Sequence, residues 1–81
     1  MALDRITIDP NVMQGKACIR GMRITVGLVL NLLANRMSHE DILRNYPDLM
    51  DEDIRQCLEY AARLAEERVI LFGELHHAVS G

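Results

Sequence analysis

Residues 38–54 read SHEDILRNYPDLMDEDI and carry the start and stop signals of two helices. Ser38 followed by Asp41 resembles a capping box, which begins a helix, with Asp in the place that Glu or Gln usually fills. Pro47 ends this helix, because the residue before a proline is pushed out of helical geometry. The acidic run 51–53 then opens another helix, since a helix N-terminus favours negative charge. The sequence therefore predicts two helices joined by a short turn, at about 38–45 and about 51–68.

A further helix is predicted upstream, at about 26–35. Thr25 can cap its start by accepting a hydrogen bond from a backbone N–H group, and Asn35 can end it. Apolar side chains fall on two of its faces, and Leu28 and Leu32 lie on the second. Because a helix that is apolar on both sides is buried on both sides, we expect one face to contact another subunit.

The N-terminal part of the chain predicts a small β element over about 5–24. Residues 5–9 alternate polar and apolar side chains before a proline, which is typical of a strand and a turn. Two more extended pieces are expected at 16–20 and 22–25, on either side of Gly21. The fold class expected for residues 1–81 is a single, mainly α, helix-turn-helix-like three-helix domain with a short N-terminal β element.

The last predicted helix carries an apolar stripe at helical spacing, which predicts its core face: Ile54, Cys57, Leu58, Ala61, Leu64 and Ala65. Beyond it lies a C-terminal tail, 69–81, which begins with the apolar run 69–72. This run fits either the last helical turns or a short strand.

The composition is that of a small globular domain. The chain has 81 residues, of which 49% are hydrophobic and 26% charged. A domain of this size is marginally stable alone. Because the chain has only two cysteines, disulfides are not expected to stabilise it, and oligomerisation is the expected alternative. These unpaired cysteines favour a reducing, cytoplasmic location. The most apolar stretch, Val26–Ala34, has nine residues, whereas a membrane span needs about 20, so no membrane association is expected.

The net charge of −3 hides an asymmetry along the chain. Residues 1–36 carry a charge of +3 and residues 37–81 carry −6. A basic front and an acidic back predict two different partner surfaces.

If the chain binds DNA, the cations are the candidate contacts: Lys16, Arg20, Arg23, Arg44 and Arg55. Alternation on a β-ribbon could place Arg20 at a base edge. A solvated strand edge that charge protects from pairing is an equally good reading of the N-terminal cations. The acids at 51–53 disfavour a recognition helix deep in the major groove, and we expect them to form a solvated, capped helix start.

Nothing in the sequence indicates catalysis. His39, His76 and His77 lack partners at metal-ligand spacing, and Cys18 and Cys57 form neither a zinc nor a redox motif. Both thiols are expected to be packed. We therefore predict a protein that is not an enzyme and has no metal or cofactor.

Five segments together resemble the domain-of-unknown-function family 433. They are RITIDP at 5–10, GKACIRGMRITV at 15–26, SHEDIL at 38–43, YPDL at 46–49 and DEDI at 51–54, and the resemblance extends from residue 5 to about residue 68. Departures from the family pattern occur at Ala17, Met22 and Met50. The last of these removes a usual cap of the final helix, and Asp51 is the expected substitute.

This resemblance implies a function. Several members of the family are similar to antitoxins of type II toxin–antitoxin pairs, which neutralise a PIN-like nuclease toxin and repress their own operon as dimers. The leading hypothesis is a homodimeric, DNA-binding antitoxin whose tail engages the toxin. Its expected dimer contact comprises Leu28, Leu32, Val69, Ile70, Leu71 and Phe72. The alternative is a dimeric protein-interaction module that does not bind DNA.

Overall fold

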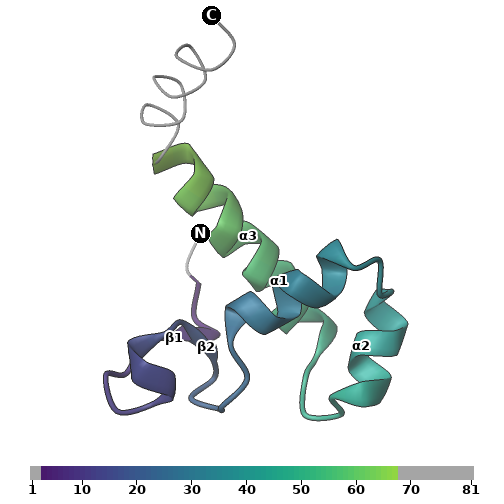
Figure 1. Cartoon of the computed structure of the whole chain (residues 1–81), viewed down its shortest axis with the longest axis horizontal. Helices are drawn as coiled ribbons and strands as arrows, with labels where there is room; N and C mark the ends of the chain where they lie inside the picture. The colour runs from purple at the N-terminus through teal and green to yellow at the C-terminus, as the bar shows by residue number, and fades with distance from the viewer. Residues whose placement is uncertain (1–2, 68–81) are drawn as a thin grey trace, which may run out of the picture.

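The computed structural model describes residues 3–67. A two-stranded antiparallel β element, β1 (Ile6–Thr7) and β2 (Cys18–Ile19), precedes three helices. These are α1 (Val26–Ala34), α2 (His39–Asn45) and α3 (Asp51–Glu67), and Figure 1 shows α1 and α2 grouped about the first half of α3. The predicted mainly α fold with a short N-terminal β element is confirmed.

The β element is smaller than the sequence indicates. Ile6 pairs with Ile19 and Thr7 with Cys18, and the expected extended piece at 22–25 contributes only a single bridge between Cys18 and Thr25. Thr25 is already the cap of α1, so the chain turns helical before another strand can form.

The predicted N-terminal caps of α1 and α2 are present. The Thr25 hydroxyl accepts a hydrogen bond from the Leu28 N–H at 3.0 Å, and the Ser38 hydroxyl accepts one from the Asp41 N–H at 3.1 Å. Helix α1 ends at Ala34, and the predicted stop residue Asn35 is its C-terminal cap. Side-chain oxygens at these positions satisfy N–H groups that have no partner within the helix.

Ser38→Ala is expected to lower the free energy of unfolding by about 1 kcal/mol, because the exposed Ser38 contributes its cap bond and little packing. Chemical denaturation followed by circular dichroism measures this loss. The control Ser38→Asp keeps an acceptor oxygen and should stay within a few tenths of a kcal/mol of the wild type. Equal losses in both variants would contradict a capping role.

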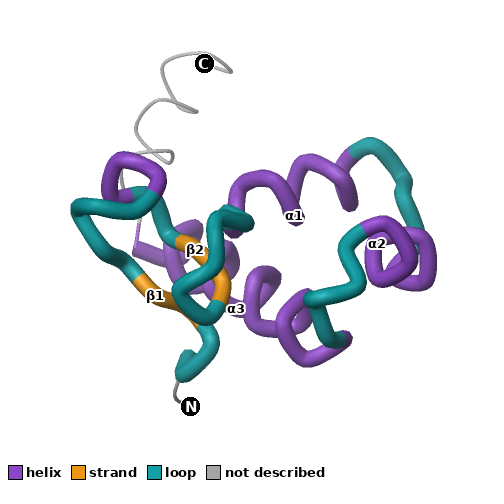
Figure 2. Tube along the Cα trace, turned by 90° about the horizontal axis from the view of Figure 1, so that it is seen from below, coloured by secondary structure: helices purple, strands orange, loops and turns teal. Residues whose placement is uncertain are grey.

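The core combines side chains of β2, of the three helices and of the loop before α3. Figure 2 shows the backbone around it, with the β element on one side and α2 on the other. Its fully or nearly fully buried apolar members are Ile19, Val26, Val29, Ile42, Leu49, Ile54 and Cys57. Burial raises the pKa of the Cys57 thiol to about 11, so this cysteine is a neutral packing group at physiological pH, as expected. Cys18 is also buried and its thiol donates to the Lys16 carbonyl.

Of the apolar stripe of α3, only Ile54 and Cys57 are buried in the core. Ile54 and Cys57 are fully buried, whereas Leu58 is 44% and Leu64 38% exposed. The prediction that the whole stripe faces the core is therefore wrong. Helix α3 has 17 residues against nine in α1 and seven in α2, so its second half extends past the helices that cover its first half (Figure 1).

Within residues 3–67, no helix combines the length and apolarity required to cross a bilayer.

Candidate functional site

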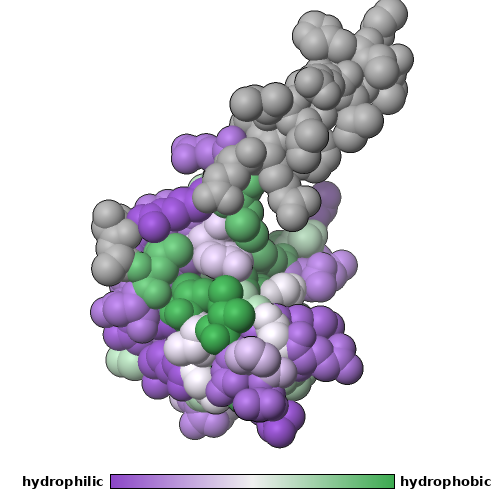
Figure 3. Space-filling model, turned by 90° about the vertical axis from the view of Figure 1, so that its left-hand side faces the viewer, coloured by the Kyte–Doolittle hydropathy of each residue, from purple (hydrophilic) through white to green (hydrophobic). Residues whose placement is uncertain are grey.

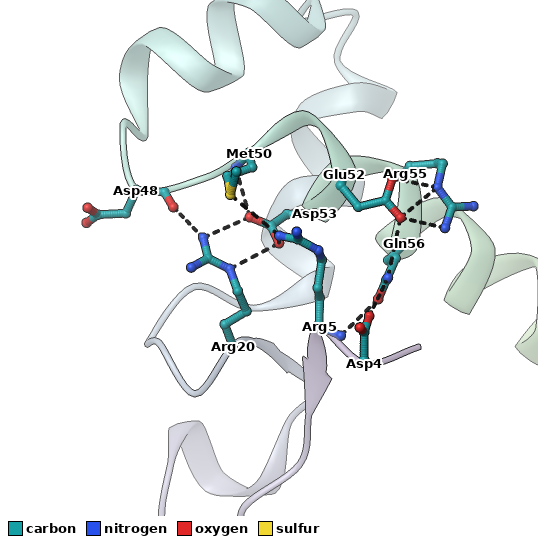
Figure 4. Close-up of polar contacts among 9 residues, drawn as sticks. All are labelled: Asp4, Arg5, Arg20, Asp48, Met50, Glu52, Asp53, Arg55 and Gln56. Atoms are coloured by element: carbon teal, nitrogen blue, oxygen red, sulfur yellow. Dashed lines mark hydrogen bonds and ion pairs between the residues drawn. The ribbon is translucent and has the colours of Figure 1, made fainter. Parts of the chain in front are cut away.

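Two arginines of the β element converge on one carboxylate of α3 (Figure 4). Arg5 and Arg20 are neighbours across the ribbon, where the Arg20 N–H donates to the Arg5 carbonyl at 2.8 Å. Arg5 Nη1 lies 3.0 Å from Asp53 Oδ1, and Arg20 Nη2 lies 2.9 Å from Asp53 Oδ2. Like charges on facing strand positions repel each other, and the shared Asp53 converts this repulsion into a link between the ribbon and α3.

Asp53 is fully buried and ionised. Burial opposes its charge, but hydrogen bonds from Arg20, from the Met50 N–H at 2.8 Å and from Arg5 outweigh it and hold the pKa of Asp53 below its usual value. The expectation that the acids at 51–53 are all solvated is therefore wrong for Asp53. A local pattern of acids at a helix start cannot reveal a partner that lies 33 residues away.

The start of α3 also differs from the expected cap. Helix α3 begins at Asp51, which places Met50 at the cap position, and Asp53 supplies the side-chain acceptor for the Met50 N–H. This is the reverse half of a capping box. The Asp51 carboxylate instead lies on the surface, 3.2 Å from Nδ1 of His39.

Gln56 continues this cluster toward the N-terminus. Its side-chain oxygen accepts a hydrogen bond from the Arg5 N–H at 2.9 Å, and its amide nitrogen donates to Asp4 at 2.8 Å. Gln56 is only 3% exposed. This role of Gln56 is not apparent from the sequence, because its contacts join residues about 50 positions apart.

Arg20 connects the β element to the start of α3. It has a φ of 48° and the following Gly21 a φ of 71°, so the chain reverses through two left-handed residues. This conformation is unfavourable for a side chain other than Gly, Asn or Asp and persists where tertiary contacts fix it. Those contacts are the Asp53 pair and a hydrogen bond to the Asp48 carbonyl. Arg20 was predicted to bind DNA, and the structure commits its guanidinium to these internal acceptors.

Two other predicted DNA contacts are paired on the helix surface. Arg44 lies 2.8 Å from Asp41, and Arg55 lies 2.7 Å from Glu52, each pair one helical turn apart. The hydrogen bond from Arg55 lowers the pKa of Glu52, so that carboxylate stays charged. These arginines are exposed, but each has an acid beside it that offsets its charge.

Lys16 and Arg23 differ from the other predicted cations. In the part of the chain from Leu3 to Glu67, neither forms an ion pair. They line one pocket of about 410 Å³ together with Asn11, Met13 and Gln14. The structure thus brings two of the five predicted cations together and places Arg44 and Arg55 on other elements.

An apolar groove of about 770 Å³ lies between α1 and the second half of α3. Leu28 lines it from α1, and Tyr60, Ala61 and Leu64 line it from α3. Lys16 also contributes to its lining. Of the predicted dimer residues, Leu28 faces this groove, whereas Leu32 packs against the core. Figure 3 shows hydrophobic surface on the face that carries the β element, continuing toward the end of α3. The other predicted contacts, Val69, Ile70, Leu71 and Phe72, lie outside the described residues.

No metal centre is formed by residues 3–67, where no three His, Cys, Asp or Glu side chains are grouped to hold an ion. The described chain is thus a three-helix, helix-turn-helix-like domain whose N-terminal ribbon is ion-paired to its last helix. Its surface offers an apolar groove and a cationic pocket.

The chain belongs to the DUF433 family, described as proteins of unknown function, whose family model matches residues 6–61. The crystal structure of a DUF433 member protein from Anabaena variabilis ATCC 29413 is similar, with a TM-score of 0.72 at 32% sequence identity. The match covers 78% of this chain and 62% of that chain, so this chain spans less than two thirds of that protein. None of the curated proteins matches.

Proposed function

We propose that the chain is a DNA-binding antitoxin of a type II toxin–antitoxin pair. It acts in the cytoplasm as a homodimer, binds a PIN-like toxin and represses its own operon. The antitoxin role comes from the family resemblance. The observation that carries the proposal is the apolar groove between α1 and α3, which supports a protein that works by binding a partner.

The groove leaves apolar side chains exposed, although the buried polar groups of the described domain are all hydrogen-bonded. In residues 3–67, every buried side-chain nitrogen and oxygen has a hydrogen-bond partner. Leu64 nevertheless remains 38% exposed beside Leu28 and Tyr60. Covering apolar surface yields about 25 cal/mol per Å², which matters in a domain with so small a core. A second copy can supply that cover, since a two-fold axis brings the same face of two subunits together.

The DNA contacts are assigned to the β element. Lys16 and Arg23 are available for phosphates, whereas the start of α3 presents the carboxylates of Asp51 and Glu52. Phosphate contacts position a protein on DNA, and strands as well as helices can enter a groove. Contact with the toxin is assigned to the segment after Arg68, beyond the described residues.

The dimer is tested by two matched substitutions on α3. Leu64 lines the groove and Leu58 does not, although both are exposed. We expect light scattering to give a dimer mass for the wild type and for Leu58→Glu at micromolar concentration, and a monomer mass for Leu64→Glu. A monomeric wild type, or a dimer that survives Leu64→Glu, would remove the groove from the proposal.

DNA and toxin binding are tested separately. We expect a gel shift with the DNA upstream of the gene that weakens as salt rises, and co-purification with the product of the neighbouring gene.

The second candidate function is an interaction module without DNA binding. It is favoured by the internal pairing of Arg20 and by the acids beside Arg44 and Arg55. Co-purification without any gel shift at low salt would replace the first proposal by the second.

A further inference from the structure

We infer that the pocket beside residues 11–16 is a binding site for a phosphate oxyanion. The inference rests on the proposed function for the source of that phosphate, which is the DNA backbone. The site itself rests on its own geometry. Its lining consists of the cations Lys16 and Arg23, the amides Asn11 and Gln14, and Met13.

The chemistry of the lining suits an oxyanion. An ammonium, a guanidinium and two amide groups all donate hydrogen bonds, and no carboxylate lines the pocket. The carboxylate of Asp9, which lies nearby in sequence, accepts the Asn11 N–H at 2.9 Å and is not part of the lining. Charge-assisted hydrogen bonds from Arg and Lys to phosphate are among the stronger polar contacts in proteins.

The two cations are free to act. Throughout residues 3–67, the ion pairs of the chain involve other cations, and the Arg23 guanidinium donates to the Met13 sulfur at 4.0 Å. Sulfur is a weak acceptor that leaves the charge of a guanidinium uncompensated. A phosphate would supply Lys16 and Arg23 with a negative charge, as Asp53 does for Arg5 and Arg20.

The backbone holds the donors in place. Met13, Gln14 and Gly15 have φ values of 49°, 60° and 79°, so three successive residues are left-handed. Two hydrogen bonds close this turn, from the Gly15 N–H to the Val12 carbonyl and from the Lys16 N–H to the Met13 carbonyl. A left-handed conformation is costly at Met13 and Gln14, and such strain concentrates at binding sites.

The test uses inorganic phosphate and duplex DNA as two probes of the full chain. In NMR titrations at constant ionic strength, we expect phosphate to shift the amide signals of residues 11–16 saturably. Chloride should not do so, and Lys16→Gln and Arg23→Gln should lose the effect. The control Arg36→Asn removes an equal charge elsewhere and keeps a residue that tolerates the φ of 68° at that position. Shifts that chloride reproduces, or that survive Arg23→Gln, would overturn the site.

The DNA arm identifies the source of the phosphate. Arg23→Gln is expected to weaken duplex binding about ten-fold at about 50 mM salt and to reduce the salt slope by about one per subunit, with little change in Arg36→Asn. Duplex binding that Lys16→Gln and Arg23→Gln leave unchanged would overturn the inference and the assignment of the DNA contacts to these two residues, while DNA binding itself stands. Saturable phosphate binding without duplex binding would support the site and remove DNA from the proposed function.

Discussion

Asp53→Ala is expected to lower the free energy of unfolding by about 3 kcal/mol. Removing one partner of a buried ion pair typically costs about 3–5 kcal/mol, and the lower end applies because both arginines still reach water. The variant also loses the acceptor of the Met50 N–H at the start of α3. Urea denaturation measures the total effect, and amide exchange at Arg20 tests whether the β element detaches first.

The control for this prediction is Asp51→Ala. It removes the same charge two residues away on the same helix, but the Asp51 side chain is 74% exposed. Its effect should stay within about 0.5 kcal/mol of the wild type. Equal stability of Asp53→Ala and Asp51→Ala would show that the Arg5–Asp53–Arg20 cluster does not stabilise the fold.

The same cluster predicts a pH dependence of known sign. The folded-state pKa of Asp53 is lowered, so its contribution to stability is fully present above the ordinary Asp pKa and is lost as pH falls through the lowered value. Asp53→Asn cannot ionise and lacks this contribution. We expect the stability difference between wild type and Asp53→Asn to be constant near neutral pH and to shrink below about pH 4. A difference that grows on acidification would contradict the assignment.

Ile54→Ala is expected to cost about 2–5 kcal/mol, which would leave a domain of this size largely unfolded. Ile54 is fully buried at the centre of the core, where a missing side chain leaves a cavity between α3 and its neighbours. Thermal and urea denaturation both measure the loss.

Leu64→Ala is the matched substitution for Ile54→Ala. It lies on the same apolar stripe of α3 but is 38% exposed beside the groove. In the monomer it should cost less than about 1 kcal/mol, and its larger effect should appear in the dimer mass. If the two variants were equally destabilised in the monomer, the second half of α3 would belong to the core after all.

Helix positions were predictable because their signals are local. Thr25 and Ser38 mark helix starts through hydrogen bonds to residues three positions on, and Pro47 acts on the residue before it. The apolar stripe of α3 was equally visible, but which of its residues are buried depends on how the other elements pack against the helix. Periodicity reports which face of a helix is apolar and not what covers that face.

The candidate site was predictable only as a set of cations. The sequence gives no means of separating Lys16 and Arg23, which line an open pocket, from Arg20, which is bound to a carboxylate 33 residues away. A predicted hairpin with Arg5 facing Arg20 could have signalled the need for a nearby acid. Asp53 could not be chosen among the three acids that open α3 without the packing of that helix on the ribbon.

Residue order and local hydrogen bonding were enough to specify three helices, the caps of the first two and a short ribbon before them. The charge asymmetry between the two halves of the chain was also plain, but its meaning came from the folded molecule. Part of the basic front and part of the acidic back neutralise each other, because the fold places Asp53 between Arg5 and Arg20. Coulomb interactions depend on distance in space, and distances between residues far apart in the chain exist only once the helices have packed.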